Sequence, residues 1–313
     1  MNSADMINLT SQLAAPAFFD MLALAGLGAL LPALVAEAAG LASGKIFADK
    51  FAQQMASLFT TFMAVSAIAF LGGAIILMRG LPWLREWLTS PQSPMLPALA
   101  AWGTALFFGG VYHFTFKPMR SNKAVHLLLG LLGALASLAS IPLTLAASPA
   151  LLGSFGSGKA PVMHPLVLPA PNSLLWPFAL QFTLLSIGLA GGLGMAYLVY
   201  RRNRDDFGRD YYNYALPAAA RWAAPFMLLQ TAGMVWLLLM LPPDIRALLL
   251  GSSLAPLLYA GAALALACCA LWTVVLRSRA PLRLKGLILT GAICAWGVHL
   301  AAVVLCFVLL PAV

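Results

Sequence analysis

The chain has 313 residues, of which 62% are hydrophobic and only 9% are charged, whereas a soluble domain is roughly 45–50% apolar and about 25% charged. This composition excludes a soluble globular protein and leaves a polytopic membrane protein. Lys and Arg number 18 against 9 Asp and Glu, a net charge of +9. In a membrane protein such an excess is explained first by topology, so the charge indicates no nucleic-acid partner.

Eight stretches are long and apolar enough to cross a bilayer as helices, because about 20 residues span a hydrocarbon core of about 30 Å. They cover approximately residues 16–38, 52–78, 95–116, 124–147, 174–200, 214–241, 251–276 and 286–310. Residues rich in Pro, Gly and Ser separate several of them, as at 90–94 and 153–158. We therefore expect an all-α polytopic membrane protein with eight transmembrane helices.

The basic residues gather in every second connection. The loops after the first, third, fifth and seventh spans hold 13 of the 18, and the opposite loops hold Arg79, Arg85, Lys159 and Arg246. Because positively charged loops remain in the cytoplasm, both termini are expected to face outward. The spacing also suggests a duplication, with one four-helix bundle in residues 1–150 and a second in 151–313.

Few ionisable residues lie within the predicted spans, and each is a candidate for function because a charge in hydrocarbon is costly. Asp20 is expected near the outer end of the first span and Glu37 near its inner end, while Arg221 lies in the sixth. For Glu37 and Arg221 the simpler interpretation is that the side chains extend towards the cytoplasmic interface. A similar interpretation applies to Asp20.

His299 differs because it lies midway along the eighth span, where no interface is within reach. It is either a hydrogen-bonded core histidine or an axial haem ligand. His113 and His126 flank the basic loop between the third and fourth spans, and His164 is expected in an outer loop.

Other chemistry finds little support in the sequence. The four Cys lie in apolar runs without CxxC or CxxCH spacing, and neither a phosphate-binding GxxxxGK[ST] loop nor an HExxH motif occurs. Gly192 and Gly194 are better explained by close helix packing than by a nucleotide loop.

Two segments resemble the large subunit of cytochrome bd-type quinol oxidases. In the first, Glu37 precedes Ser43-Gly44-Lys45 and a series of phenylalanines at 47, 51 and 59. In the second, an R-x-x-K-x-x-H pattern formed by Arg120, Lys123 and His126 leads into the fourth span. The resemblance identifies the chain as a divergent member of the subunit I superfamily.

The chain departs from this family at most of the family's haem ligands. Phe19 stands at the position of the histidine that binds the oxygen-reducing haem. The low-spin haem's His and Met have no equivalents, since no His lies between His164 and His299 and no Met follows Met240. The proton-conducting acids of the third helix are absent from 95–116, and the quinol-binding loop is reduced to about 241–246. Oxygen reduction by this chain is therefore not expected.

One ligand position survives in altered form, because His299 aligns with the glutamate that holds the family's remaining haem. The resemblance thus implies His299 as a candidate axial ligand of the iron of one b-type haem, although a chain without haem stays an alternative. Further candidate cofactor contacts are His126, Arg120, Arg221 and Asp20.

Two functions remain open at this point. The chain is either a bd-like subunit of a respiratory complex that passes electrons between quinone and a partner redox protein, or a haem-free anchor that docks redox subunits. It is at most a subunit of a membrane oxidoreductase complex. Expected partners are membrane lipid, a second bd-like membrane subunit and other redox subunits such as a cytochrome c, in a bacterial or archaeal inner membrane. A secondary transporter is a weaker third hypothesis, suggested by the repeat and by prolines within spans.

Overall fold

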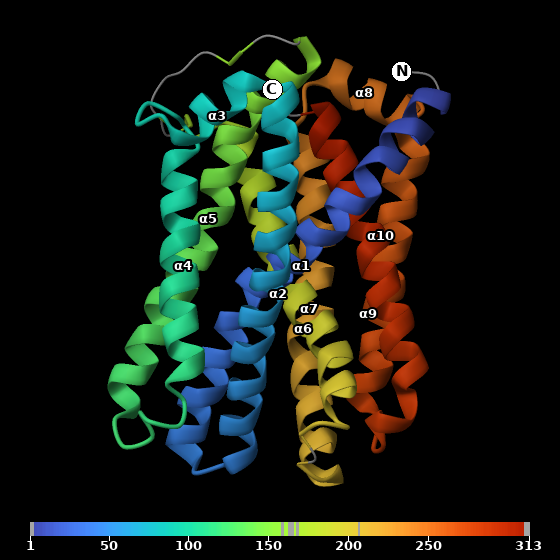
Figure 1. The fold of residues 1–313 in the computed structure, drawn as a ribbon. Coiled ribbons are helices and arrows are strands. Elements are labelled where there is room, and N and C mark those ends of the chain that lie inside the picture. Colours follow the sequence, from blue (N-terminus) through green and yellow to red (C-terminus); the bar gives the residue numbers. More distant parts are fainter. Residues whose placement is uncertain (1–2, 158–159, 162–165, 167–168, 206, 310–313) are drawn as a thin grey trace.

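The computed structural model describes residues 3–157, 160–161, 166, 169–205 and 207–309, and throughout these ranges the regular structure is helical. Figure 1 shows the helices as a bundle of long, roughly parallel rods. They are α1 (Ser3–Ser43), α2 (Ile46–Gly80), α3 (Pro82–Thr89), α4 (Leu96–Phe114), α5 (Lys123–Ser157), α6 (Leu175–Arg201), α7 (Arg209–Met240), α8 (Pro243–Gly251), α9 (Ala255–Arg277), the 3₁₀ helix η1 (Pro281–Leu284) and α10 (Lys285–Leu309). The expectation of an all-α chain is confirmed.

Within the described residues, seven helices are long and apolar enough to cross a membrane: α1, α2, α5, α6, α7, α9 and α10. The chain is therefore a multi-pass membrane protein. The predicted third span corresponds to α4, a helix of 19 residues that is long enough but not apolar enough to be among the seven. In Figure 1 α4 nevertheless runs beside α5 along the bundle, and the two helices are in contact.

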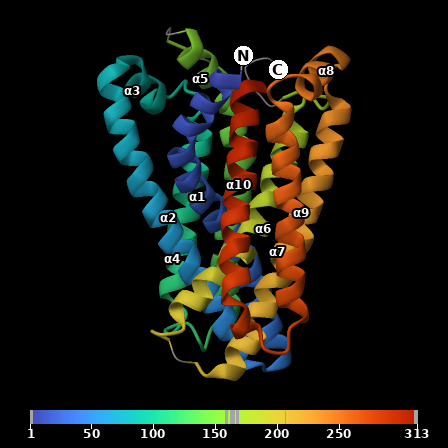
Figure 2. The ribbon, with the colours of Figure 1, turned by 90° about the vertical axis from the view of Figure 1, so that its right-hand side faces the viewer.

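The long helices pack as two neighbouring sets that share one core. In the first set α1 contacts α2 and α5, and α4 contacts α2 and α5; in the second, α6 contacts α7 and α10, and α9 contacts α7 and α10. Helix α1 also contacts α6 and α10, which joins the sets. A single hydrophobic cluster accordingly runs through all the long helices. Figure 2 shows α10 in front of α6, with α9 and α7 at its side.

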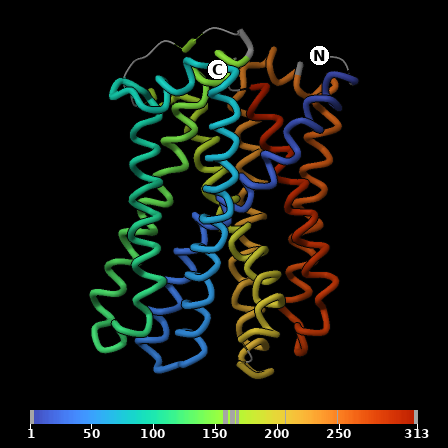
Figure 3. The backbone as a smooth tube through the Cα atoms, in the orientation of Figure 1, coloured from blue at the N-terminus to red at the C-terminus, as the bar shows by residue number. Residues whose placement is uncertain are grey.

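The four basic connections lie together at one end of the bundle. Figure 3 shows the ends of the helices that the α1–α2, α4–α5, α6–α7 and α9–α10 connections join at its lower end, whereas α1 begins and α10 ends at the upper end. The three described basic residues of the opposite connections, Arg79, Arg85 and Arg246, belong to α2, α3 and α8; Lys159 lies outside the described residues.

Several predicted boundaries were wrong. Helix α1 begins at Ser3, so Asp20 lies in the middle of a 41-residue helix and not near the outer end of a span. Its first turns are rich in Ala, Leu and Met, which favour helix, and Pro16 does not end it. Helix α5 likewise continues through the Gly-rich segment predicted as a connection, as far as Ser157. The short helices α3 and α8 were not predicted.

Small residues let the two sets approach closely. A Cβ atom on Gly28 of α1 would clash with the backbone of Ser186 on α6. On α6 itself, a Cβ on Gly192 would clash with the ring of Trp272 from α9, and one on Gly194 would contact the Met55 side chain of α2 at 3.3 Å. The prediction that Gly192 and Gly194 serve helix packing is confirmed.

Candidate functional sites

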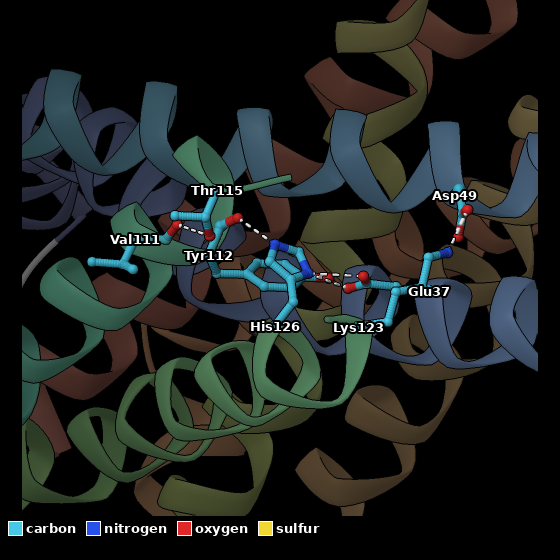
Figure 4. A network of polar contacts seen from close by, with 7 residues as sticks. All are labelled: Glu37, Asp49, Val111, Tyr112, Thr115, Lys123 and His126. Carbon is cyan, nitrogen blue, oxygen red and sulfur yellow. Dashed lines mark hydrogen bonds and ion pairs between the residues drawn. The ribbon is translucent and has the colours of Figure 1, made fainter. Parts of the chain in front are cut away.

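The first site is a buried carboxyl–imidazole pair between α1 and α5. His126 Nδ1 lies 2.8 and 2.9 Å from the two carboxylate oxygens of Glu37, and His126 Nε2 lies 2.9 Å from the Tyr112 carbonyl oxygen. Glu37 is 2% exposed and His126 is 1% exposed. Figure 4 shows the imidazole between these two partners. The expectation that Glu37 extends to the interface was wrong, because a buried carboxylate needs a partner and His126 supplies it.

Aromatic rings fix the orientation of the imidazole. The Tyr112 ring stacks on His126 with centroids 4.4 Å apart, and the Phe116 ring meets it edge-on at 4.5 Å. Since both nitrogens of His126 already have hydrogen-bond partners, this side chain can bind a metal or haem only by giving one of them up. The arrangement suits a fixed structural hydrogen-bonded pair.

A polar hollow of about 390 Å³ opens beside this pair at the basic end of the bundle. Arg120 lines it together with Glu37, Lys50 and Asp49, and Asp49 Oδ2 lies 2.6 Å from Lys123 Nζ. The structure therefore brings two candidate residues, His126 and Arg120, to the same region around Glu37.

The second site joins the beginning and the end of the chain. His299 Nε2 on α10 lies 2.9 Å from Asp20 Oδ2 on α1, and the His299 side chain is fully buried while that of Asp20 is 41% exposed. When Asp20 is ionised, its carboxylate accepts only, so Nε2–H donates. His299 Nδ1 has no accessible surface and no hydrogen-bond partner among the described residues.

The surroundings of His299 can be compared with what a haem requires. A ligating histidine commonly donates its second N–H to a carboxylate, and Asp20 occupies that position. No space opens at the ring, however: Nδ1 is buried, and neither the cavity that Asp20 lines nor an apolar groove of about 820 Å³ between α1, α6 and α10 includes His299 in its lining. The cavity that Asp20 lines with Phe182 and Cys306 holds about 210 Å³ and does not reach His299, whereas cofactor pockets hold about 300–1,000 Å³. The residues around His299 therefore do not fit a haem in this packing.

The other candidates lie apart from both sites. Arg221 is exposed on α7 and lines none of the hollows beside Glu37 or Asp20. His113 is partly buried near the end of α4, and His164 falls outside the described residues. No group of three or more metal-binding side chains occurs in the part of the chain that the structure describes.

Two polar features were not found from the sequence. Gln54 Nε2 and Arg201 Nε donate to Asp205 Oδ2 at 2.9 and 2.6 Å, tying α2 to the connection after α6. The Arg201–Asp205 spacing of four residues was a usable signal, but nothing in the sequence points to Gln54. Gln181 on α6, with Gln230 on α7, lines an apolar cavity of about 210 Å³ within the second set.

The fold is similar to that of a solved oxidase. The structure of bd oxidase from Geobacillus thermodenitrificans matches 96% of this chain and 86% of its own chain with a TM-score of 0.70. The sequence identity is 16%, so the match concerns the fold alone. No protein-family model matches the sequence, and no curated protein matches it. The chain is thus a multi-pass helical membrane protein with a cytochrome bd-like fold.

Proposed function

We propose that this chain is a bd-like membrane subunit of a respiratory electron-transfer complex, that it does not reduce oxygen, and that it works as a haem-free scaffold for other redox subunits. One observation carries the choice of a haem-free role: His299, the remaining ligand candidate, is bonded to Asp20 and packed without space for a haem. In such a scaffold the Asp20–His299 contact joins the first helix to the last and helps to fix the surface presented to partners.

The proposal includes a specific topology. Eight spans, with α4 as the third, form two four-helix bundles within residues 1–150 and 151–313, and both termini face outward. The contacts within each set of helices and the shared end of the basic connections support this arrangement. The membrane is the inner membrane of a bacterium or archaeon, and the partners are a second bd-like subunit, a cytochrome c and quinone.

One observation favours a second candidate, in which the chain holds one b-type haem and passes electrons between quinone and a partner protein. His299 Nδ1 is buried without a partner, while Asp20 holds the other ring nitrogen as a carboxylate does behind a metal-bound histidine. Ligation would then require α10 and its neighbours to separate at His299.

Reduced-minus-oxidised spectra of the purified chain distinguish the two candidates. A haem-free scaffold gives no b-type absorbance in the wild type. A band that disappears in His299→Ala and persists in the matched variant His113→Ala would overturn the haem-free role. Copurification of the native complex, with its subunits identified and its haem measured, tests the scaffold itself: redox subunits should accompany the chain and carry the haem, and a chain isolated without any such subunit contradicts docking.

A further inference from the structure

A second hollow at the basic end has the chemistry of an anion site. It holds about 300 Å³ between the α6–α7 connection and the α9–α10 connection. Its polar lining consists of Arg202, Arg209, Arg283, Lys285 and the amide of Asn213. Among the residues that the structure describes, no carboxylate lines this hollow. Within the described part of the chain, four cations therefore converge on one space whose lining includes no carboxylate.

The hollow beside Glu37 provides a comparison within the same molecule. There the basic residues share the wall with Glu37 and Asp49, and these carboxylates pair with His126 and Lys123. The second hollow also receives the first residues of two helices, Arg209 of α7 and Lys285 of α10, whose N-termini carry partial positive charge. An excess of basic residues on one side of a membrane is ordinary, but their convergence on one hollow indicates an anionic ligand.

An apolar groove begins one helical turn from this hollow. It holds about 820 Å³ between α1, α6 and α10, and its lining is apolar, with Phe18, Leu193 and Trp296 among its residues. Leu289 and Ile293 also line it and are 50% and 68% exposed. Because residues four apart share a helix face, Lys285, Leu289 and Ile293 form one stripe along α10, about 12 Å long at 1.5 Å per residue.

We propose that the hollow and the groove together bind one phospholipid with an anionic headgroup. The phosphate group lies among Arg202, Arg209, Arg283 and Lys285, and an acyl chain follows the stripe of α10 into the groove. The combination of cationic wall and adjoining apolar groove favours a lipid over a free anion, since basic pockets between membrane helices recognise acidic headgroups. The bound lipid would seal the groove between the two sets of helices.

Native mass spectrometry of the full chain in detergent tests the headgroup site, with phosphatidylglycerol and phosphatidylcholine as probes. The wild type should retain one phosphatidylglycerol in preference to phosphatidylcholine. The double variant Arg283→Gln/Lys285→Gln should bind phosphatidylglycerol about 30-fold more weakly, from the loss of two cations near an acidic lipid. The control Lys45→Gln/Arg277→Gln removes two exposed charges from the same end and should bind as the wild type does. Equal retention of the two lipids, or equal binding by the two double variants, would overturn the site.

A second arm separates a lipid from a free anion. Ala15 is an exposed residue of the groove wall, so Ala15→Phe should narrow the groove and weaken phosphatidylglycerol binding, whereas Ala42→Phe, at another exposed position of α1, should not. Inorganic phosphate is added as a competitor at the same concentrations. If it displaces the lipid completely and Ala15→Phe has no effect, the hollow is a phosphate site and the lipid proposal is wrong.

Discussion

The Glu37–His126 pair shows how a single residue can constrain the packing of two helices. Both side chains are almost fully buried, and the histidine bonds both the carboxylate and the Tyr112 carbonyl. Removing one partner from such a pair leaves an uncompensated buried charge or polar group, which costs far more than the intact pair gains.

His126→Leu should therefore destabilise the chain by about 3–5 kcal/mol, whereas the double variant Glu37→Leu/His126→Leu should recover much of that loss. Thermal unfolding in detergent measures both, with His113→Leu as the matched control at a partly buried histidine. A double variant as unstable as the sum of the two single variants would show that the pair is not coupled.

Asp205 makes a pH-dependent contribution at the basic end. Burial raises the pKa of its carboxyl, but hydrogen bonds from Arg201 and Gln54 outweigh that effect and hold the pKa below its ordinary value. A carboxyl whose pKa is lowered by folding stabilises the protein above its unfolded pKa of about 3.9, and this stability is lost as the pH falls through the lowered value.

The difference in melting temperature between the wild type and Asp205→Asn should consequently be constant from neutral pH down to about pH 5 and shrink below about pH 4. Melting curves at pH 7, 5, 4 and 3 test this expectation. A difference that grows on acidification would contradict the assignment of Asp205 as the ionised acceptor of Arg201 and Gln54.

At the scale of the elements, the closest approach between the two sets of helices depends on Gly28. A Cβ atom at this position would clash with the Ser186 backbone, which cannot move aside as the end of a flexible side chain can. Gly72 on α2 has open space around its Cβ position and is exposed, so it provides a control with the same chemical change.

Gly28→Ala should lower the melting temperature, because α1 and α6 must separate. Gly72→Ala should be neutral or stabilising by up to about 1 kcal/mol, the helix-propensity difference between the two residues. Thermal unfolding of the two variants side by side decides the matter. Equal effects of both substitutions would mean that the α1–α6 contact is not limited by backbone approach.

The helices themselves were largely predictable from the sequence, but their ends and partners were not. Long apolar stretches in the sequence predicted α2, α5, α6, α7, α9 and α10, because a helix that crosses the hydrocarbon core needs about 20 mostly apolar residues. The start of α1 at Ser3 was missed because polar residues such as Asp5, Asn8 and Gln12 lie among the Ala, Leu and Met of its first turns. These polar residues interrupt the apolar stretch by which the span was recognised, although the helix continues through them. The amphipathic helix α3 has only 8 residues, so a search for apolar stretches long enough to span a membrane does not detect it.

The candidate sites were only half predictable for a related reason. His299 stood out as an ionisable residue in the middle of an apolar span, and His126 stood out through its pattern with Arg120 and Lys123. Their partners depend on the tertiary structure. Glu37 is 89 residues from His126, and Asp20 is 279 residues from His299. Patterns of neighbouring residues in the sequence carry no information about contacts over such separations. The sequence therefore indicates each histidine as a candidate, but it does not show whether a carboxylate or a haem iron lies next to the imidazole.

At the scale of the whole molecule, the one-sided distribution of charge predicts orientation. The basic connections share one end of the bundle, away from the start of α1 and the end of α10. By the positive-inside rule, that end is expected to be cytoplasmic.

Single cysteines introduced at the basic end by Lys45→Cys or Arg279→Cys should then not react with a membrane-impermeant maleimide in intact cells, while those introduced at the opposite end by Arg85→Cys and Arg246→Cys should react.

As a control for accessibility, all four variants should react with the maleimide once the membrane is permeabilised. The wild type measures the background reaction of the native cysteines, which are buried or partly buried in α9 and α10: Cys268, Cys269, Cys294 and Cys306. Reaction at Lys45→Cys together with protection at Arg85→Cys would invert the topology. It would also move the proposed headgroup hollow at Arg283 and Lys285 to the outer face, where the lipid that it binds would have to come from the other leaflet.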